Sequence, residues 1–323
     1  MTQTKTTSLI ADIGGTNIRI AIVRPDSDKY FTELETYKCA NFTGLAEVLK
    51  QYIVQKQLSD HSLNACLAIA CPVDDDLISM TNLPWQFSQS LLKEELGLND
   101  LLLINDYKAI AMAIPLLNEE QKIKIGGGEA RPQKTISVCG PGTGLGVASL
   151  VNIENKWHCV SGEGGHVDFA PVDELEVDIW RYLHRMEQRV SYEDLLSGMG
   201  LERIYQAIAA IENESNTEKL TAQEISERGL SLDCSLCNAA LNVFCRVLGS
   251  FAGNLALTNN SLGGVYIAGG IVPRFVDFLK ASAFRSRFES KGRMSHLARQ
   301  SPTYVITESQ PGLLGAAAYV IQH

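Results

Sequence analysis

Two short glycine-rich turns carry the residue types that bind phosphate. The first covers Gly14 to Asn17 and the second covers Gly140 to Gly144, and each places a threonine, Thr16 or Thr143, beside a glycine. Backbone N–H groups can surround phosphate oxygens where no side chain intervenes, so phosphate-binding loops favour glycine. Taken alone, each turn is also compatible with a plain hairpin, because glycine is the default residue of tight hairpin turns.

The usual phosphate-binding signatures do not explain these turns. The P-loop pattern GxxxxGK followed by Ser or Thr is absent from the sequence. The dinucleotide fingerprint needs a helix after the turn, whereas Ile18–Ile22 and Val147–Val151 alternate at the period of a strand. Strands are also predicted before the turns, over Leu9–Ala11 and Thr135–Cys139. Two such hairpin turns facing each other across a cleft could hold a triphosphate, and a third glycine turn at Gly269–Gly270 supports a nucleotide site.

Asp106 is the leading candidate for a catalytic group. It follows the apolar strand predicted over Leu101–Ile104, and ligands of open α/β sheets bind beyond the carboxyl ends of the strands. A carboxylate at that place could accept the proton of an attacking hydroxyl group during phosphoryl transfer. The alternative is that Asp106 caps the helix predicted over Tyr107–Ile114, because aspartate is a preferred N-cap residue.

Glu163 and His166 lie three residues apart in a glycine-rich loop, where both side chains could reach the hydroxyl groups of a ligand. A carboxylate accepts from hydroxyls, and a neutral histidine can donate or accept. A metal-binding Glu-x-x-His pair needs a helix, and the glycines around this pair disfavour one. The other alternative is a structural loop with Asp168 as a further polar turn residue. By itself, Glu193 predicts only an exposed N-cap and first helical turn.

Asp12 is a candidate ligand for a magnesium ion. It follows a buried strand and lies beside the first glycine turn, and Mg²⁺ usually keeps several waters and takes few carboxylates. The acidic run Asp74–Asp76 is interpreted as a solvated turn. Cys234 and Cys237 form a CxxC pair, but no second pair and no histidine lies nearby, so we predict no zinc site.

Strands that alternate with helices must position these residues, which predicts an α/β fold with parallel strand pairing. Helical spacing starts near Thr43, the expected N-cap. A long apolar helix is predicted over 236–255, and a helix of small residues over 311–318. The strand–turn–strand pattern occurs twice, at 9–22 and at 135–151, which suggests two duplicated halves.

The composition excludes several functional classes. Of the 323 residues, 45% are hydrophobic and 20% are charged, which are the proportions of a folded globular protein. The formal net charge of -9 disfavours nucleic acid and anionic membranes as partners, and the basic residues from Arg285 to Arg293 alternate with apolar ones as on a helix face. No apolar stretch of ~18 residues predicts a membrane span, and Met1–Ser8 lacks the apolar core of a signal peptide. We therefore expect a cytoplasmic protein with reduced cysteines.

Six motifs, taken together and in order, resemble a known family. They are Asp12-Ile13-Gly14-Gly15-Thr16-Asn17, Ile104-Asn105-Asp106, Gly142-Thr143-Gly144-Leu145-Gly146, Gly162-Glu163-Gly164-Gly165-His166-Val167-Asp168, Leu196-Ser197-Gly198 and Ala268-Gly269-Gly270-Ile271. The first, third and last resemble the two phosphate motifs and the adenosine motif of the sugar kinase, heat-shock 70 and actin superfamily. The ordered set resembles bacterial glucokinases of the enterobacterial type, and it extends over nearly the whole chain.

This resemblance implies a ribonuclease-H-like, actin-like ATPase fold of two α/β domains with an interdomain cleft. The smaller domain would comprise residues 1–116 plus 307–323, and the larger one residues 117–306. The family phosphorylates glucose at the 6-hydroxyl, so the resemblance implies glucose, ATP and Mg²⁺ as ligands and a homodimer as the assembly. A kinase for another hexose and a catalytically silent sugar or nucleotide sensor on the same scaffold are the alternatives.

The resemblance also assigns roles to single residues. It implies that Asp106 is the catalytic base. The implied glucose ligands are Asn105, Asp106, Glu163, His166 and Glu193. The implied nucleotide ligands are Asp12, Gly14, Gly15, Thr16, Asn17, Gly142, Thr143, Gly144, Gly269 and Gly270. Asp12 would hold Mg²⁺ through water, and no zinc is expected, because the cysteine-rich motif of the related repressor and kinase family is missing between Cys159 and Cys234.

Overall fold

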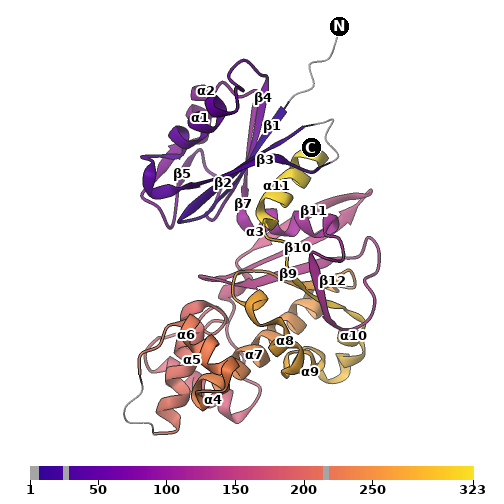
Figure 1. Cartoon of the computed structure of the whole chain (residues 1–323). Coiled ribbons are helices and arrows are strands. Elements are labelled where there is room, and N and C mark those ends of the chain that lie inside the picture. The colour runs from indigo at the N-terminus through magenta and orange to yellow at the C-terminus, as the bar shows by residue number, and fades with distance from the viewer. Residues whose placement is uncertain (1–6, 25–28, 214–217) are drawn as a thin grey trace. The chain divides into compact units, whose positions relative to one another are not determined.

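The computed structural model describes residues 7–24, 29–213 and 218–323. The chain divides into two compact units, Met1–Leu117 together with Glu308–His323, and Asn118–Thr307. Each unit contains one large β-sheet with helices packed on it (Figure 1). Most of the segment Met1–Ser8, whose composition argues against a signal peptide, lies outside the described residues.

The sheet of the first unit has five strands in the order β3-β2-β1-β4-β7. Their bounds are β1 Thr7–Ile13, β2 Asn17–Val23, β3 Thr32–Lys38, β4 Leu63–Ile69 and β7 Asp100–Asn105. β1 pairs with β2 in antiparallel orientation and with β4 in parallel orientation, and β7 extends the sheet parallel to β4. The first strand–turn–strand segment is therefore a hairpin, and the later strands pair in parallel, as the alternation of strands and helices predicted. A small separate sheet joins β5 (Leu77–Ser79) and β6 (Gln86–Ser88).

Helices cover both faces of this sheet (Figure 1). α1 (Leu45–Gln55) and α2 (Gln89–Glu95) share one buried cluster with the strands, and α3 (Asp106–Ala113) and α11 (Pro311–Gln322) share another. The helical spacing that identified α1 is confirmed, because its apolar positions are buried. The N-cap prediction is wrong: Gly44 is the N-cap, and the N–H and hydroxyl groups of Thr43 both donate to Glu47 Oε2 (2.7 and 2.8 Å).

α11 packs closely on α3 because its contact face is built from small residues. A Cβ atom placed on Gly315 would overlap the carbonyl oxygen of Ala109 on α3. Leu313 of α11 is buried in the same cluster as Ile10 of β1 and Cys66 of β4. The last helix of the chain is thus part of the core of the first unit, and it supports the helix that begins at Asp106.

We expect Gly315→Ala to destabilise the protein by about 1–3 kcal/mol, because an added methyl group would force α11 away from α3. Urea unfolding followed by circular dichroism measures this loss. Gly162→Ala is the control, since a Cβ at Gly162 would meet no atom within 4 Å. Equal stability of the two variants would show that α11 can shift at no cost.

The sheet of the second unit has six strands in the order β11-β10-β9-β12-β13-β8. Their bounds are β8 Lys122–Gly126, β9 Ile136–Pro141, β10 Leu145–Ile153, β11 Lys156–Gly162, β12 Gly264–Ile267 and β13 Thr303–Ile306. β11, β10 and β9 form an antiparallel meander, and β12 and β13 continue in parallel orientation. These five strands repeat the order and directions of β3-β2-β1-β4-β7 in the first sheet. The duplication suggested by the two strand–turn–strand segments is therefore present in the topology.

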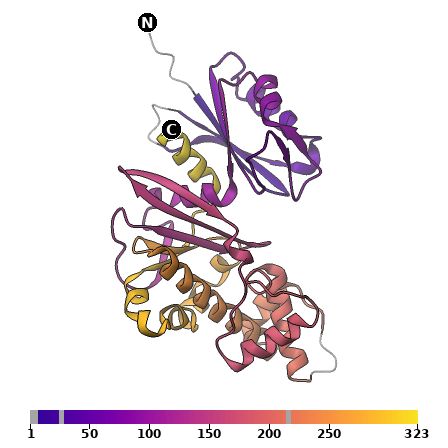
Figure 2. The ribbon, with the colours of Figure 1, turned by 180° about the vertical axis from the view of Figure 1, so that it is seen from behind.

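The long helix α7 (Ser235–Asn259) is the centre of the second unit. It lies against β9, β12 and helices α5 (Gly198–Ile211), α6 (Ala222–Ser231) and α9 (Phe284–Glu289). Figure 2 shows these helices from behind. By length and composition alone α7 would pass as a membrane span, but 72% of its most apolar stretch is buried inside the protein. We therefore interpret α7 as a core helix. The remaining helices are α4 (Glu174–His184), α8 (Val276–Ala281) and α10 (Ser295–Gln300).

A buried ion pair joins α4 to α9. Glu176 is fully buried, and its two carboxylate oxygens accept from Nη2 of Arg287 (2.8 and 2.9 Å). The same guanidinium donates through Nη1 to Asp173, the N-cap of α4 (3.1 Å), and through Nε to the Ser250 hydroxyl of α7 (3.1 Å). The alternating basic segment of the sequence is therefore not a simple solvated face, because the side chain of Arg287 is only 14% exposed.

Candidate active site

The first unit brings its candidate residues to one edge of its sheet. In the parallel register, Ile13 of β1 lies opposite Ile69 of β4, and Ile69 lies opposite Asn105 of β7. The carboxyl ends of the three strands are therefore level with one another. Asp12 comes just before the end of β1, and Asp106 comes just after the end of β7. Ligands of open α/β sheets bind at such an edge.

Asn105, rather than Asp106, is the N-cap of α3. Asn105 Oδ1 accepts from the N–H groups of Tyr107 (2.9 Å) and Lys108 (3.4 Å). The alternative of a capping role for Asp106 is thus wrong. Asp106 is the first residue of α3, and its Oδ1 also accepts from the N–H of Tyr107 (2.9 Å). Because the cap engages the Oδ1 atom of Asn105, the Nδ2 amide is the part of this side chain that could donate to a substrate hydroxyl.

Packing within the protein explains only one of the two glycines of the first turn. A Cβ on Gly15 would lie 2.8 Å from the Cβ of Asn82, so packing within the first unit requires a glycine there. A Cβ on Gly14 would meet nothing closer than the carbonyl oxygen of Asn17 at 3.4 Å, which is ordinary contact. Gly15 and Thr16 are both exposed. The turn therefore offers an accessible hydroxyl and a bare stretch of backbone.

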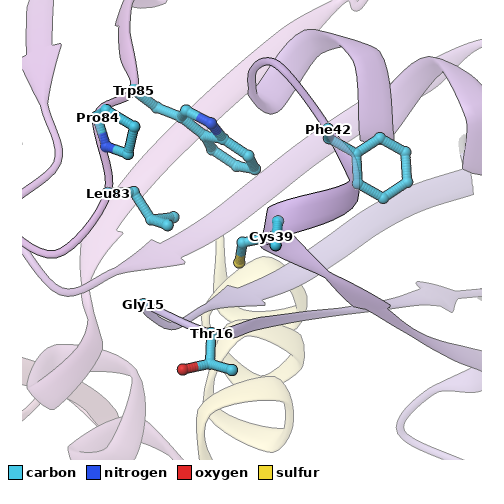
Figure 3. A pocket seen from close by; sticks show the side chains of 8 residues that line it. Gly15, Thr16, Cys39, Phe42, Leu83, Pro84 and Trp85 are labelled. Carbon is cyan, nitrogen blue, oxygen red and sulfur yellow. The ribbon is translucent and has the colours of Figure 1, made fainter.

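A hollow of about 410 Å³ lies beside this turn (Figure 3). One wall comes from the loop Leu83–Trp85, and the other from the segment after β3, which includes the short 3₁₀ helix η1 (Cys39–Asn41). The size is that of a small-molecule pocket. Its lining is mostly apolar and consists of Gly15, Thr16, Cys39, Ala40, Phe42, Leu83, Pro84 and Trp85.

Asp12 is half-buried and has a cationic neighbour. Its carboxylate lies 3.5 Å from Nη1 of Arg19, which faces it across the β1–β2 hairpin. Burial raises the pKa of Asp12, and the Arg19 guanidinium opposes part of that shift. A Cβ on Gly312, in the first turn of α11, would lie 2.8 Å from the Asp12 carboxyl carbon. The start of α11 is therefore shaped around this carboxylate.

The second unit brings two glycine turns together. The N–H of Gly142 donates to the carbonyl of Gly144 (2.8 Å), and the carbonyl of Gly142 accepts from the N–H of Gly198 at the start of α5 (2.9 Å). Gly269 has a φ of +82°, and a Cβ there would overlap the carbonyl oxygen of Pro141, so it must be glycine. By contrast, a Cβ on Gly270 would meet no atom within 4 Å.

Glu193 reaches from a loop to the end of the second glycine turn, where β10 begins. Its Oε2 accepts from the N–H of Leu145 (2.7 Å), and its Oε1 lies 3.8 Å from Nδ1 of His166. The N-cap and first turn predicted over Ser191–Asp194 are present, because the Ser191 hydroxyl accepts from the N–H of Asp194 (3.4 Å) and the N–H of Leu196 donates to the carbonyl of Tyr192 (2.8 Å). The predicted exposure is wrong, since Ser191 is buried and the Glu193 side chain is 32% exposed. Nothing in its local sequence signals these contacts, because Leu145 is 48 residues away.

A single 3₁₀ turn, η3 (Gly164–His166), begins directly after Glu163 and ends at His166. The predicted absence of an α-helix holds, but the segment is a helical turn rather than an open loop. A Cβ on Gly164 would lie 3.1 Å from Val147 of β10, so the turn packs on the second hairpin. Asp168 is paired with Arg189, whose Nε donates to its Oδ1 (2.5 Å).

Six of the eight cysteines are small buried side chains, and Cys159 and Cys234 are partly buried. None forms a disulfide, and burial raises the pKa of Cys66 and Cys139 to about 12. Cys234 is the N-cap of α7, and its sulfur accepts from the N–H of Cys237 (3.3 Å). Within the described residues, no group of three or more His, Cys, Asp or Glu side chains is arranged to hold a metal.

The fold is shared with a sugar kinase of known structure. A solved structure of a glucokinase from an Antarctic psychrotroph superimposes with a TM-score of 0.90 at 37% identity, over 98% of this chain and 99% of that one.

The sequence matches specify the family. The profile of the glucokinase family matches residues 9–323. A glucokinase of Colwellia psychrerythraea is 62% identical over 99% of this chain and 98% of its own length. A glucokinase of Photorhabdus laumondii is 47% identical over 97% of both chains. The chain belongs to the glucokinase family, which confirms the resemblance seen in its ordered motifs.

Proposed function

We propose that this protein transfers the γ-phosphoryl group of ATP to the 6-hydroxyl of glucose, giving glucose 6-phosphate and ADP. The observation that carries the proposal is the 62% identity to a glucokinase along nearly the whole of both chains. The placement of Asp106 at the carboxyl edge of the first sheet supports it independently, because this edge is where α/β sheets bind their ligands.

In this proposal Asp106 is the general base that accepts the proton of the 6-hydroxyl as it attacks the γ-phosphorus. Phosphoryl transfer needs positioning and charge stabilisation more than covalent chemistry, so one carboxylate base is sufficient. Asn105 would donate to a sugar hydroxyl through its free amide hydrogens. Glu163, His166 and Glu193 would bind further hydroxyls, because carboxylates and imidazole suit groups that donate and accept.

The nucleotide would lie against the three glycine turns. Gly14, Gly142 and Gly270 support this assignment, because a Cβ on any of them would meet no protein atom closer than 3.4 Å. Glycine at these positions is explained if a ligand approaches the backbone. The remaining proposed contacts come from Asp12, Gly15, Thr16, Asn17, Thr143, Gly144 and Gly269.

Asp12 is the residue that would hold Mg²⁺. One half-buried carboxylate beside a phosphate turn fits an ion that takes few protein ligands. When bound, the ion would neutralise charge on the triphosphate. Arg19 faces the same carboxylate.

We further propose that the fold is the ribonuclease-H-like, actin-like one, with domains at 1–116 plus 307–323 and at 117–306. The repeated strand order in the two sheets supports this assignment. Asn105 and Asp106 belong to the first unit, and Glu163, His166 and Glu193 belong to the second. The interdomain cleft, the homodimer and the cytoplasmic location stay predictions.

An assay of ADP release across a panel of hexoses tests the function. We expect the highest kcat/KM with glucose, and stoichiometric glucose 6-phosphate in an assay coupled to its dehydrogenase. A higher kcat/KM with mannose or an amino sugar would favour a kinase for that sugar. Glucose binding without turnover on any hexose would favour a sensor and overturn the proposal.

A further inference from the structure

One carboxylate in the second unit lies between a proposed sugar ligand, His166, and the second glycine turn, Gly140–Gly144, hereafter the second phosphate turn. Oε2 of Glu193 accepts from the N–H of Leu145 (2.7 Å), and Oε1 faces His166 at 3.8 Å. The carboxylate also lies over Gly144, since a Cβ there would be 2.5 Å from Oε2. Gly144 is therefore glycine because of Glu193, whereas Gly142 has no such neighbour.

The backbone of Glu193 is fixed from two sides. Its N–H donates to the carbonyl of Gly165 in η3 (2.9 Å), and its carbonyl accepts from the hydroxyl of Ser197, the N-cap of α5 (2.9 Å). A carboxylate on such a fixed backbone has little freedom to move away from Leu145. A hydrogen bond from a backbone N–H to a charged acceptor is also among the stronger ones in proteins.

We propose that Glu193 is a positioning residue that holds the second phosphate turn in its nucleotide-binding shape, in addition to its role toward the sugar. The inference rests on the proposed function, which supplies the two ligands. The hexose hydroxyls and the phosphate turn would then share one carboxylate. A substitution of Glu193 would then alter nucleotide binding even without sugar. A substitution of Gly144 would alter sugar binding even without nucleotide.

The charge of Glu193 has to be separated from its hydrogen bond. A carboxylate near a polyphosphate site repels the nucleotide, so removing it has two opposed effects. Glu193→Gln and Glu193→Ala both remove the charge, but only glutamine keeps an oxygen that can accept from the N–H of Leu145. The difference between these two variants therefore reports the side-chain contacts with the turn, including the hydrogen bond, without the effect of the charge.

The first experiment measures binding of the ATP analogue AMPPNP with magnesium by calorimetry, without sugar. We expect Glu193→Ala to bind AMPPNP about tenfold more weakly than Glu193→Gln, the loss expected for one well-aligned neutral hydrogen bond. Asp178→Ala is the control, because it also removes a carboxylate, Asp178 is exposed on α4 and pairs with Arg181, and the variant should match the wild type in this assay. Equal affinities of the glutamine and alanine variants would overturn the inference.

The reciprocal experiment measures glucose binding without nucleotide. Gly144→Ala should weaken it about tenfold, because the new methyl group would displace the Glu193 carboxylate. Gly44→Ala should leave it unchanged, because a Cβ there would meet no atom within 4 Å and Gly44 lies outside the proposed binding residues. Equal effects of the two substitutions would contradict the link. A wild-type protein that binds neither glucose nor AMPPNP would instead overturn the proposed function.

Discussion

Replacing Asp106 with asparagine is expected to lower kcat for glucose phosphorylation by about 10²–10⁴-fold, the contribution typical of a general base. Asparagine has nearly the same shape and keeps an oxygen that can accept from the N–H of Tyr107, as Asp106 Oδ1 does at 2.9 Å. The start of α3 should therefore stay in place, while the group that accepts the proton is lost. Steady-state kinetics and glucose binding by calorimetry separate the loss of kcat from any loss of affinity.

Asp100→Asn is the matched control. Asp100 lies at the other end of β7, is exposed, and is 3.4 Å from Lys93 Nζ, so its replacement should leave kcat unchanged. Retained turnover in Asp106→Asn would show that another group, or water, takes the proton. Weaker glucose binding with kcat unchanged would instead make Asp106 a sugar ligand without a role as base.

Arg287→Met is expected to lower the free energy of unfolding by about 3–5 kcal/mol. Glu176 has no solvent exposure and pairs with both oxygens to the Arg287 guanidinium. Removing the arginine leaves a buried charge without its partner, which is one of the costliest single changes in a protein core. Urea unfolding followed by tryptophan fluorescence and circular dichroism measures the change.

Two further variants test this explanation. Arg181→Met is the control, because the pair of Arg181 and Asp178 on α4 is exposed and should contribute no more than about 1 kcal/mol. The double variant Arg287→Met with Glu176→Met should recover much of the lost stability, because replacing both partners also removes the buried, unpaired carboxylate. A double variant as unstable as Arg287→Met alone would mean that packing around Arg287, and not its charge, stabilises the site.

Short-range patterns were sufficient to predict most of the elements. Ile18, Ile20 and Ile22 alternate with smaller or polar residues, and all three are buried in β2 of the first hairpin. Most of the apolar positions over 236–255 are likewise buried in α7, although Leu236 and Leu255 at the ends of the segment are only partly buried. These patterns follow from the geometry of single strands and helices, so they can be read without knowledge of the rest of the chain.

Contacts between distant segments could not be predicted in the same way. Arg287 alternates with apolar neighbours as on a solvated helix, but its partner Glu176 lies 111 residues away. Glu193 reads locally as the start of a helix, and only the fold brings it to Leu145. The N-cap of α3 could not be predicted for a more local reason. Asn105 and Asp106 both suit an N-cap, and the residue at which the helical backbone begins, which tertiary packing sets, decides between them.

The placement of α11 has a consequence for biosynthesis. Nascent chains generally fold from the N-terminus onward as the ribosome releases them. Here the first sheet has to wait for its last helix, because residues 311–322 emerge only after all of Asn118–Thr307 has been translated. Until then, Ile10 and Cys66 lack the cover that Leu313 provides. The second unit, which is continuous in the chain, can therefore mature before the first one, so a chaperone holding the nascent polypeptide would find its exposed apolar surface near the N-terminal end.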